Sequence, residues 1–231
     1  LKQTQSFRSP KMIQIKKEGI LLEKTALDFE SHGVLNPGVL QQGNTVHLFY
    51  RAVSKGNHSS IGYCKLEGPD QITERSTEPV IAPEFVYEGH GTEDPRVCQI
   101  DGTYYLTYTA YDGVNALGAL ATSTDLKHFE KRGILVPQLS YFEFEKLTKE
   151  ADNVDDRYWS YFNSNPLIKE INRNNLIWDK NLVFFPRRIH GKLHFLHRIK
   201  PDIQLVSVRE LSDLTPEFWK GYISNLEKHT V

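Results

Sequence analysis

The chain has few cysteines, almost no net charge and no long hydrophobic run. Its 231 residues include two cysteines, Cys64 and Cys98, and its 28 basic residues nearly balance 29 acidic ones. Two cysteines within strand-like sequence favour buried small side chains over a disulfide or a ligand pair. A net charge of -1 offers no field that would attract nucleic acid or an anionic membrane, so neither partner is expected. No apolar run reaches the roughly 18 residues of a membrane-spanning helix.

Several functional signatures are missing as well. No glycine-rich loop follows a strand pattern and no paired-cysteine motif occurs, which leaves nucleotide-binding and dithiol redox functions without support. His194 and His197 lie three residues apart, on opposite faces of a strand, so these rings and nearby His190 are not expected to share a metal ion. No cleavable leader pattern is visible, although a chain that begins with Leu1 is compatible with a leader already removed.

Aromatic residues and short strand patterns are what the chain has in abundance. The 11 Tyr, 12 Phe and 3 Trp suit a β core or a site for neutral polar ligands such as sugars. Strand, tight turn, long strand, loop and strand recur in order, which predicts antiparallel meanders and an all-β fold. The predicted strands, in chain order, are 37–40, 45–51 and 61–66, then 96–100, 103–109 and 118–123, then 182–189, 192–198 and 203–208.

The spacing of the copies predicts one repeating domain over 1–231. The long strands begin about 58 and then about 89 residues apart, and an acidic insertion around 140–165 enlarges the second gap. Without the insertion the period is near 60, which is compatible with propeller blades of four short strands.

Two helices are predicted outside the strands. The insertion is expected to hold one over Phe142–Ala151, followed by a solvated loop, because its aspartates (Asp152, Asp155 and Asp156) do not have the spacing of a calcium loop. A second helix or capped turn is predicted near 215–222, with Thr215 as the cap and Pro216 at the first position.

The string Gly-Thr-Glu-Asp-Pro-Arg at 91–96 is the strongest candidate for chemistry. It combines two carboxylates, a rigid proline and an arginine between predicted strands. Because Pro95 restricts the residue before it, Asp94 is expected to be extended and its carboxyl to be aimed at one atom of a substrate. A turn carrying a surface ion pair is the alternative interpretation.

Six segments, in this order, resemble glycoside hydrolase family 130: LNPGVL (35–40), LFYRAV (48–53), GTEDPRV (91–97), YYLTYTAYDG (104–113), ALATSTDL (119–126) and FFPRRIHGKLHFLHR (184–198). The resemblance extends over about 33–214. Members of that family are five-bladed β-propeller enzymes that act on β-mannosides, most of them inverting phosphorylases and some inverting hydrolases. The resemblance therefore implies about three blades of such a propeller in this chain.

The resemblance also implies roles for particular residues. Asp94 matches the catalytic general acid, which passes its proton through a hydroxyl of the bound mannose while phosphate attacks the opposite face of the sugar. Other matched positions surround the sugar (Arg51, Tyr111 and Asp112) or form the cationic cluster that receives phosphate (Lys180, His197 and Arg198). Arg96 is expected to face substrate hydroxyls or to anchor its own turn. For Asp112, a simple turn role is equally open.

The chain departs from the family in two respects. The stretch 114–118 lacks the arginine that often completes the phosphate site, and Lys131 or Arg132 would have to compensate. The chain also ends about three blades into the propeller, so a fragment or truncated relative, or assembly with another chain, is expected because open blade edges would otherwise be exposed.

The leading functional hypothesis is inverting phosphorolysis of a β-mannoside, which yields mannose 1-phosphate and an acceptor sugar. Inorganic phosphate would be a co-substrate, and no metal or other cofactor is implied. The alternatives are inverting hydrolysis, for which adjacent Glu93 is expected to point away, and a non-catalytic glycan-binding propeller fragment. A phosphorylase favours the cytoplasm, because its sugar phosphate is useful inside a cell; a hydrolase would fit the periplasm as well.

Overall fold

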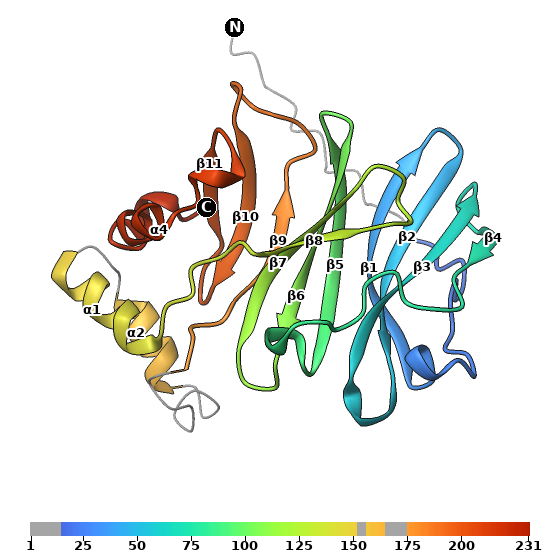
Figure 1. Cartoon of the computed structure of the whole chain (residues 1–231), viewed down its shortest axis with the longest axis horizontal. Helices are drawn as coiled ribbons and strands as arrows, with labels where there is room; N and C mark the ends of the chain where they lie inside the picture. The colour runs from blue at the N-terminus through green and yellow to red at the C-terminus, as the bar shows by residue number, and fades with distance from the viewer. Residues whose placement is uncertain (1–14, 152–155, 165–174) are drawn as a thin grey trace, which may run out of the picture.

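A computed structural model describes residues 15–151, 156–164 and 175–231. Three β meanders lie side by side in one open, mixed sheet of 11 strands, and helices cover one end of the row (Figure 1). Neighbouring strands within a meander are antiparallel, whereas single parallel pairings join the meanders at Ser59 with Gly91 and at Leu117 with Asp179.

The strands follow the three predicted repeats. The first meander comprises β1 (Gly33–Gln42), β2 (Thr45–Val53), β3 (Ser59–Glu67) and β4 (Gln71–Arg75). The second comprises β5 (Gly91–Ile100), β6 (Thr103–Tyr111), β7 (Ala116–Ser123) and β8 (Glu130–Ile134). The third comprises β9 (Asp179–Phe184), β10 (Leu193–Ile199) and β11 (Gln204–Val208).

The helices are α1 (Tyr141–Ala151), α2 (Asp156–Ser164) and α4 (Pro216–Ile223). Short 3-10 turns occur at η1 (Asp28–Glu30), η2 (Lys55–Asn57), η3 (Val86–Glu88), η4 (Leu211–Asp213) and η5 (Leu226–His229). The predicted cap of α4 is confirmed: Thr215 Oγ1 accepts a hydrogen bond from the Phe218 N–H at 3.2 Å, and Pro216 occupies the first helical turn.

The meander prediction is confirmed, and three details are corrected. The fold is predominantly β rather than all-β, and β9 ends at Phe184, before the predicted end of that strand. Within the insertion α1 forms as predicted, but Asp156 begins α2 where a solvated loop was expected; Asp152 and Asp155 lie outside the described residues. The helices form because their aromatic side chains complete the core: Phe144 and Tyr158 are fully buried.

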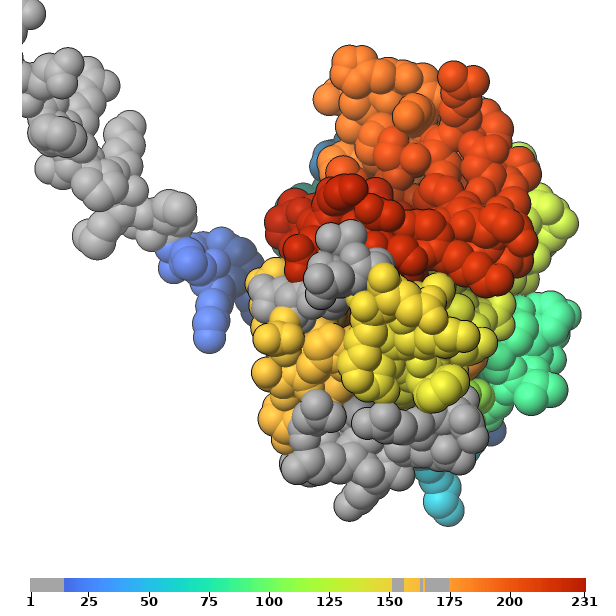
Figure 2. Space-filling view, turned by 90° about the vertical axis from the view of Figure 1, so that its left-hand side faces the viewer, coloured from blue at the N-terminus to red at the C-terminus, as the bar shows by residue number. Residues whose placement is uncertain are grey.

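The end of the molecule beyond the third meander carries these helices. The largest buried cluster contains strand residues of β5, β7, β9, β10 and β11 together with aromatic residues of α1, α2 and α4. In Figure 2, α1 (yellow) and the C-terminal segment (red) lie against each other across this end. The sheet edge beside the third meander is therefore partly covered by helices of the same chain.

The first two meanders contain the same buried polar arrangement, a glutamate bound by a tyrosine and a cation. A glutamate from the 3-10 turn before the first strand is 0% exposed, accepts a hydrogen bond from a tyrosine of the second strand, and pairs with a cation of the fourth strand. These sets are Glu30, Tyr50 and Arg75, and Glu88, Tyr108 and Lys131. Each tyrosine hydroxyl donates to its carboxylate at 2.7 Å. A buried carboxylate is tolerated there because both a cation and a hydroxyl satisfy it.

Candidate active site

The first strand of each meander contains one residue in the left-handed conformation. These residues are Asn36 (φ 48°), Asp94 (φ 50°) and Asn181 (φ 64°), and the strand pairing slips by a bulge at each. The expectation that Asp94 is extended was wrong. Asparagine and aspartate tolerate left-handed backbone better than most residues, and a bulge redirects the side chains around it.

Asp94 is held by two residues of the first meander. The Asn36 side-chain amide donates to Asp94 Oδ1 at 2.6 Å, and Arg51 Nη1 lies 3.9 Å from the same oxygen. The Asp94 side chain is 13% exposed. The carboxylate is thus oriented by neighbours from another meander yet remains within reach of a ligand.

Glu93 had been expected to point away from the site, but it lies beside Asp94. Its Oε1 is 2.7 Å from Arg51 Nη2, so a single guanidinium contacts both carboxylates. Arg51 is fixed further because its Nε donates to Ser59 Oγ at 2.8 Å. The side chains of Arg51 and Glu93 are only 14% and 9% exposed, so their ion pair is largely buried. Burial raises the pKa of Glu93, and the charges of Arg51 and Lys180 oppose that rise.

Lys180 and Arg198 are cross-strand neighbours on β9 and β10. Burial lowers the pKa of Lys180, and the charges of Glu93 and Asp94 oppose that shift, so the lysine lies within electrostatic range of the two carboxylates. Two buried polar atoms nearby have no partner among the residues that the structure places: Arg198 Nε and Asn181 Oδ1. Buried polar atoms are normally paired, so these two mark a place where a polar ligand or water would bind.

His197 is not brought to this cluster. Its side chain is 0% exposed; Nδ1 lies 2.7 Å from Asp179 Oδ2, and Nε2 lies 2.9 Å from the Tyr222 hydroxyl on α4. By strand register, His197 is the counterpart of Tyr50 and Tyr108. Each of the three is the residue of the second strand that lies opposite the bulge of the first strand. In the third meander the buried carboxylate thus meets an imidazole instead of a phenol.

The remaining predicted residues have local partners. The Asp112 carboxylate accepts hydrogen bonds from the backbone N–H groups of Val114 and Asn115 at 2.8 and 2.6 Å, which favours the turn role for Asp112. Arg96 Nη1 donates to the carbonyl of adjacent Pro95 at 2.7 Å, so the arginine anchors its own turn. The Tyr111 ring lies beside the cluster, and burial, followed by the charge of Glu93, raises its pKa.

Asn36 and Trp178 are among the residues of the site that escaped the sequence reasoning. Asn36 could have been found, because Asn36-Pro37 precedes Asp94-Pro95 by 58 residues, the period of the repeat. Trp178 carries no such signal, yet its ring lies 6.4 Å from Tyr111 and 5.4 Å from Lys180 Nζ.

The two cations proposed to compensate for the missing arginine, Lys131 and Arg132, bind other partners. Lys131 pairs with buried Glu88, as described above. Arg132 Nε donates to Thr122 Oγ1 at 2.8 Å, and its Nη1 donates to Glu130 at the same distance. Neither residue therefore contributes to the cluster around Lys180.

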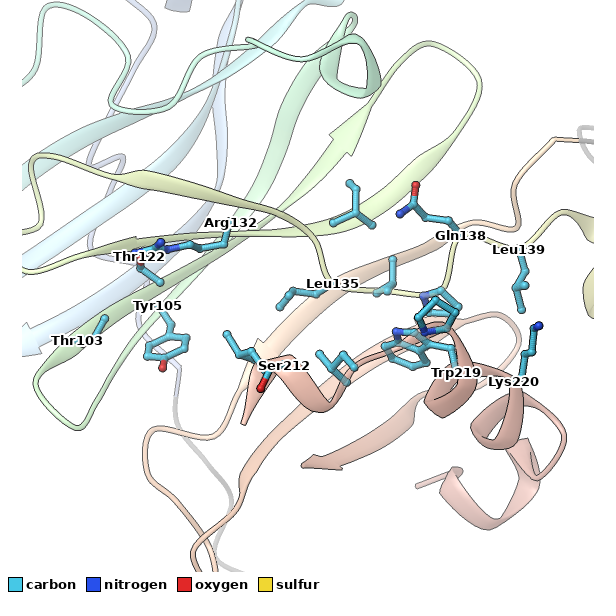
Figure 3. Close-up of a pocket in the computed structure, with 16 residues that line it drawn as sticks. Thr103, Tyr105, Thr122, Arg132, Leu135, Gln138, Leu139, Ser212, Trp219 and Lys220 are labelled. Carbon is cyan, nitrogen blue, oxygen red and sulfur yellow. Dashed lines mark hydrogen bonds between the residues drawn. The ribbon is translucent and has the colours of Figure 1, made fainter. Parts of the chain in front are cut away.

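A groove of about 770 Å³ lies apart from this cluster, between the segment after β8 and helix α4 (Figure 3). Its walls are mainly apolar, with Tyr105, Leu135 and Trp219 among them. None of the residues gathered around Asp94 lines it. Its charged lining residues are Arg132, which already has partners, and Lys220, and its lining includes no Asp, Glu or His that could act as a general acid or base.

The described part of the chain offers no group of three His, Cys, Asp or Glu side chains that could hold a metal ion. Within the same ranges, no helix is long and apolar enough to cross a membrane. Cys64 and Cys98 are free and buried, which confirms their interpretation as small core residues.

The sequence matches a known protein family over most of its length. The sequence profile of glycoside hydrolase family 130, described as beta-1,4-mannooligosaccharide phosphorylase, matches residues 10–218. A 1,2-beta-oligomannan phosphorylase of Thermoanaerobacter sp. (strain X514) is 26% identical over 217 residues, 87% of this chain and 59% of the relative. A beta-1,2-mannobiose phosphorylase of the same strain is 35% identical over 128 residues, 48% of this chain and 42% of the relative.

A solved structure supports the same fold. A glycosyl hydrolase from Bacteroides ovatus aligns with a TM-score of 0.60 at 18% identity, over 83% of this chain and 54% of that one. The profile match extends over most of the sequence, and the chain belongs to glycoside hydrolase family 130. It spans about three fifths or less of the length of the curated relatives it matches.

Proposed function

We propose that this chain carries the acid and phosphate-binding parts of an inverting β-mannoside phosphorylase. In the reaction an oxygen of inorganic phosphate forms a bond to the anomeric carbon of mannose. The glycosidic bond breaks, and its oxygen leaves with a proton as the hydroxyl of the acceptor sugar. The products are mannose 1-phosphate and the shortened saccharide. Both curated relatives are phosphorylases of β-1,2-linked mannosides, which supports this substrate class.

Asp94 is the proposed source of the proton, relayed through a hydroxyl of the bound mannose. The Asn36 amide fixes one carboxylate oxygen at 2.6 Å, leaving the other to face the sugar. Orientation of this kind matters because a proton donor acts only within hydrogen-bond reach of its target. Arg51, held by Glu93 and Ser59, would donate to hydroxyls of the same sugar, and Tyr111 would contact its ring.

Lys180 and Arg198 are the proposed phosphate ligands. The observation that carries this assignment is the buried, unpartnered Arg198 Nε beside a lysine whose charge lies within electrostatic range of Glu93 and Asp94. A phosphate oxygen would satisfy the orphan donor, and two converging cations would offset its charge. His197 is left out of this set because both its ring nitrogens have buried partners. Asp112 and Arg96 act through the turns they close.

The proposal also includes a closed propeller that contains this site. Three meanders with their first strands adjacent would form three blades of a five-bladed propeller, and the other blades would come from further chain or from assembly with a second chain. Mannose 1-phosphate retains the energy of the glycosidic bond in a form used inside cells, so a cytoplasmic location fits a phosphorylase.

The test is product analysis with and without phosphate. The protein is incubated with β-1,2- and β-1,4-linked mannobiose and with mannosyl-glucose, and products are identified by mass spectrometry. Mannose 1-phosphate that forms only with phosphate is the expected result. Free mannose alone would replace phosphorolysis with hydrolysis. Binding of a mannoside without turnover would favour the glycan-binding alternative.

A further inference from the structure

A row of aromatic rings borders the acid cluster, and we propose that it is a binding surface for saccharide units beyond the cleaved bond. The row consists of His58, His90, Tyr111 and Trp178 and is called the aromatic row below. Its ligand would be a β-mannoside chain of three or more units. This inference rests on the proposed function and adds to it a preference for chain length.

The rings are continuous from the first meander to the third. His58 lies 4.6 Å from His90, His90 lies 5.3 Å from Tyr111, and Tyr111 lies 6.4 Å from Trp178, measured between ring centroids. The row is held together by close backbone packing at Gly91, which pairs with both Ser59 and Tyr111. A Cβ at Gly91 would lie 2.9 Å from the Ser59 backbone nitrogen, so only glycine allows this approach.

The row offers the two kinds of group that sugar recognition needs. The His58 ring is exposed and the other three are half-buried, so ring surface is available for the apolar faces of sugars. The imidazoles of His58 and His90 make no hydrogen bond to any residue in the described ranges, which leaves their nitrogens available to sugar hydroxyls.

The third-meander end of the row is rigid and adjoins the catalytic groups. The Trp178 indole N–H donates to the Val114 carbonyl at 2.7 Å, and the Tyr111 hydroxyl donates to the Gly113 carbonyl at 2.8 Å. Lys180, the proposed phosphate ligand, has its Nζ 5.4 Å from the Trp178 ring centroid. A saccharide anchored near Asp94 would therefore meet the row directly, with little ordering cost for the protein.

Calorimetric titration with mannosides of increasing length tests the proposal. The intact chain is titrated with β-1,2- and β-1,4-linked mannobiose and mannotetraose. The wild type is expected to bind the tetraose at least about tenfold more tightly than the disaccharide. Roughly one to two aromatic contacts would supply that difference in affinity. His58→Ala and Trp178→Leu are expected to reduce that ratio toward one. The matched control is His128→Ala, which removes an exposed histidine at a distance from the row and should preserve the ratio.

The outcomes distinguish failure of the aromatic row from failure of the proposed function on which it rests. Equal wild-type affinities for both lengths, or a ratio that survives both row substitutions, would overturn the aromatic row and leave the proposed function standing. Absence of binding to every mannoside would overturn both. Circular dichroism and thermal unfolding of each variant show whether it is folded, and His58→Ala, at the exposed end, is the variant expected to leave folding intact.

Discussion

Asn36 and Asp94 lie 58 residues apart in the sequence and meet in the structure, with Asn36 Nδ2 2.6 Å from Asp94 Oδ1. Both occupy the left-handed bulge of the first strand of a meander, and both precede proline. The repeat that builds two similar strands therefore also places an amide against the candidate acid. The orientation of that acid depends on a neighbouring meander.

Removing this amide should impair turnover while leaving the fold intact. Asn36 is exposed, so Asn36→Ala creates little cavity, but Asp94 Oδ1 loses its hydrogen bond and its fixed direction. Loss of position of this kind costs about 10- to 100-fold in rate. Steady-state kinetics should show the loss, with Asn44→Ala, in the turn after β1, as the control. Rates equal to the wild type would show that Asn36 does not orient the acid.

Replacing Lys180 should separate stability from anion binding. Burial lowers the pKa of Lys180 in the folded state below its unfolded value, so the wild type loses stability as the pH falls from above about 10.5 through the lowered pKa. Lys180→Met removes that cost and should be at least as stable as the wild type at pH 7. Its affinity for phosphate should fall about tenfold or more.

The measurements are denaturant unfolding at pH 7 and pH 10.5 and calorimetry with inorganic phosphate. The stability advantage of Lys180→Met should shrink at the higher pH. Lys192→Met, which changes an exposed lysine near β10, should alter neither quantity. Phosphate affinity unchanged by Lys180→Met would remove Lys180 from the phosphate site.

The meanders and hairpins were accessible from the sequence because they are local. Strand-like runs rich in β-branched and aromatic residues at β2, β6 and β10, together with the glycine turns at Gly43 and Gly102, both with positive φ, define neighbouring strands without reference to the rest of the chain. The conformation of Asp94 was not accessible, because the rule for residues before proline was overridden by strand pairing and the Asn36 contact.

His197 shows the same limit for the candidate site. A basic residue beside Arg198 matched a family pattern, but its partners are Asp179 on the adjacent strand and Tyr222 on a helix 25 residues later. Only the packing of α4 onto β10 decides that the ring is buried. Lys180 and Arg198 were grouped by the family resemblance alone, because the predicted strand 182–189 left Lys180 out; the structure pairs them directly across β9 and β10.

His197 should prove to be structural when it is replaced. His197→Phe leaves the fully buried Asp179 carboxylate without its ring partner, and loss of a hydrogen bond to a charged group costs about 1.5–3 kcal/mol. Adding Asp179→Asn should recover part of the lost stability, because the buried charge is then gone. Urea unfolding of the single and double variants measures both effects. A fully stable His197→Phe variant with weakened phosphate binding would instead support a ligand role.

The buried glutamate that recurs in the first two meanders should contribute strongly to stability. Tyr108→Phe removes the hydroxyl that donates to buried Glu88, and a hydrogen bond to a charged group contributes about 1.5–3 kcal/mol. Tyr104→Phe is the matched control on the same strand, since that hydroxyl accepts a hydrogen bond from the neutral amide of Gln42. Chemical denaturation should rank Tyr108→Phe as clearly the more damaging. Equal losses would contradict the importance assigned to Glu88.

The most direct test of the account is phosphate-dependent formation of mannose 1-phosphate by Asp94→Asn compared with the wild type. We predict a fall of about 10²- to 10⁴-fold, with folding and phosphate binding preserved, because the proton donor is lost while Lys180 and Arg198 remain. Asp70→Asn, in an exposed turn, should retain the wild-type rate. An Asp94→Asn enzyme within a few-fold of the wild type would contradict the assignment of Asp94 as the acid.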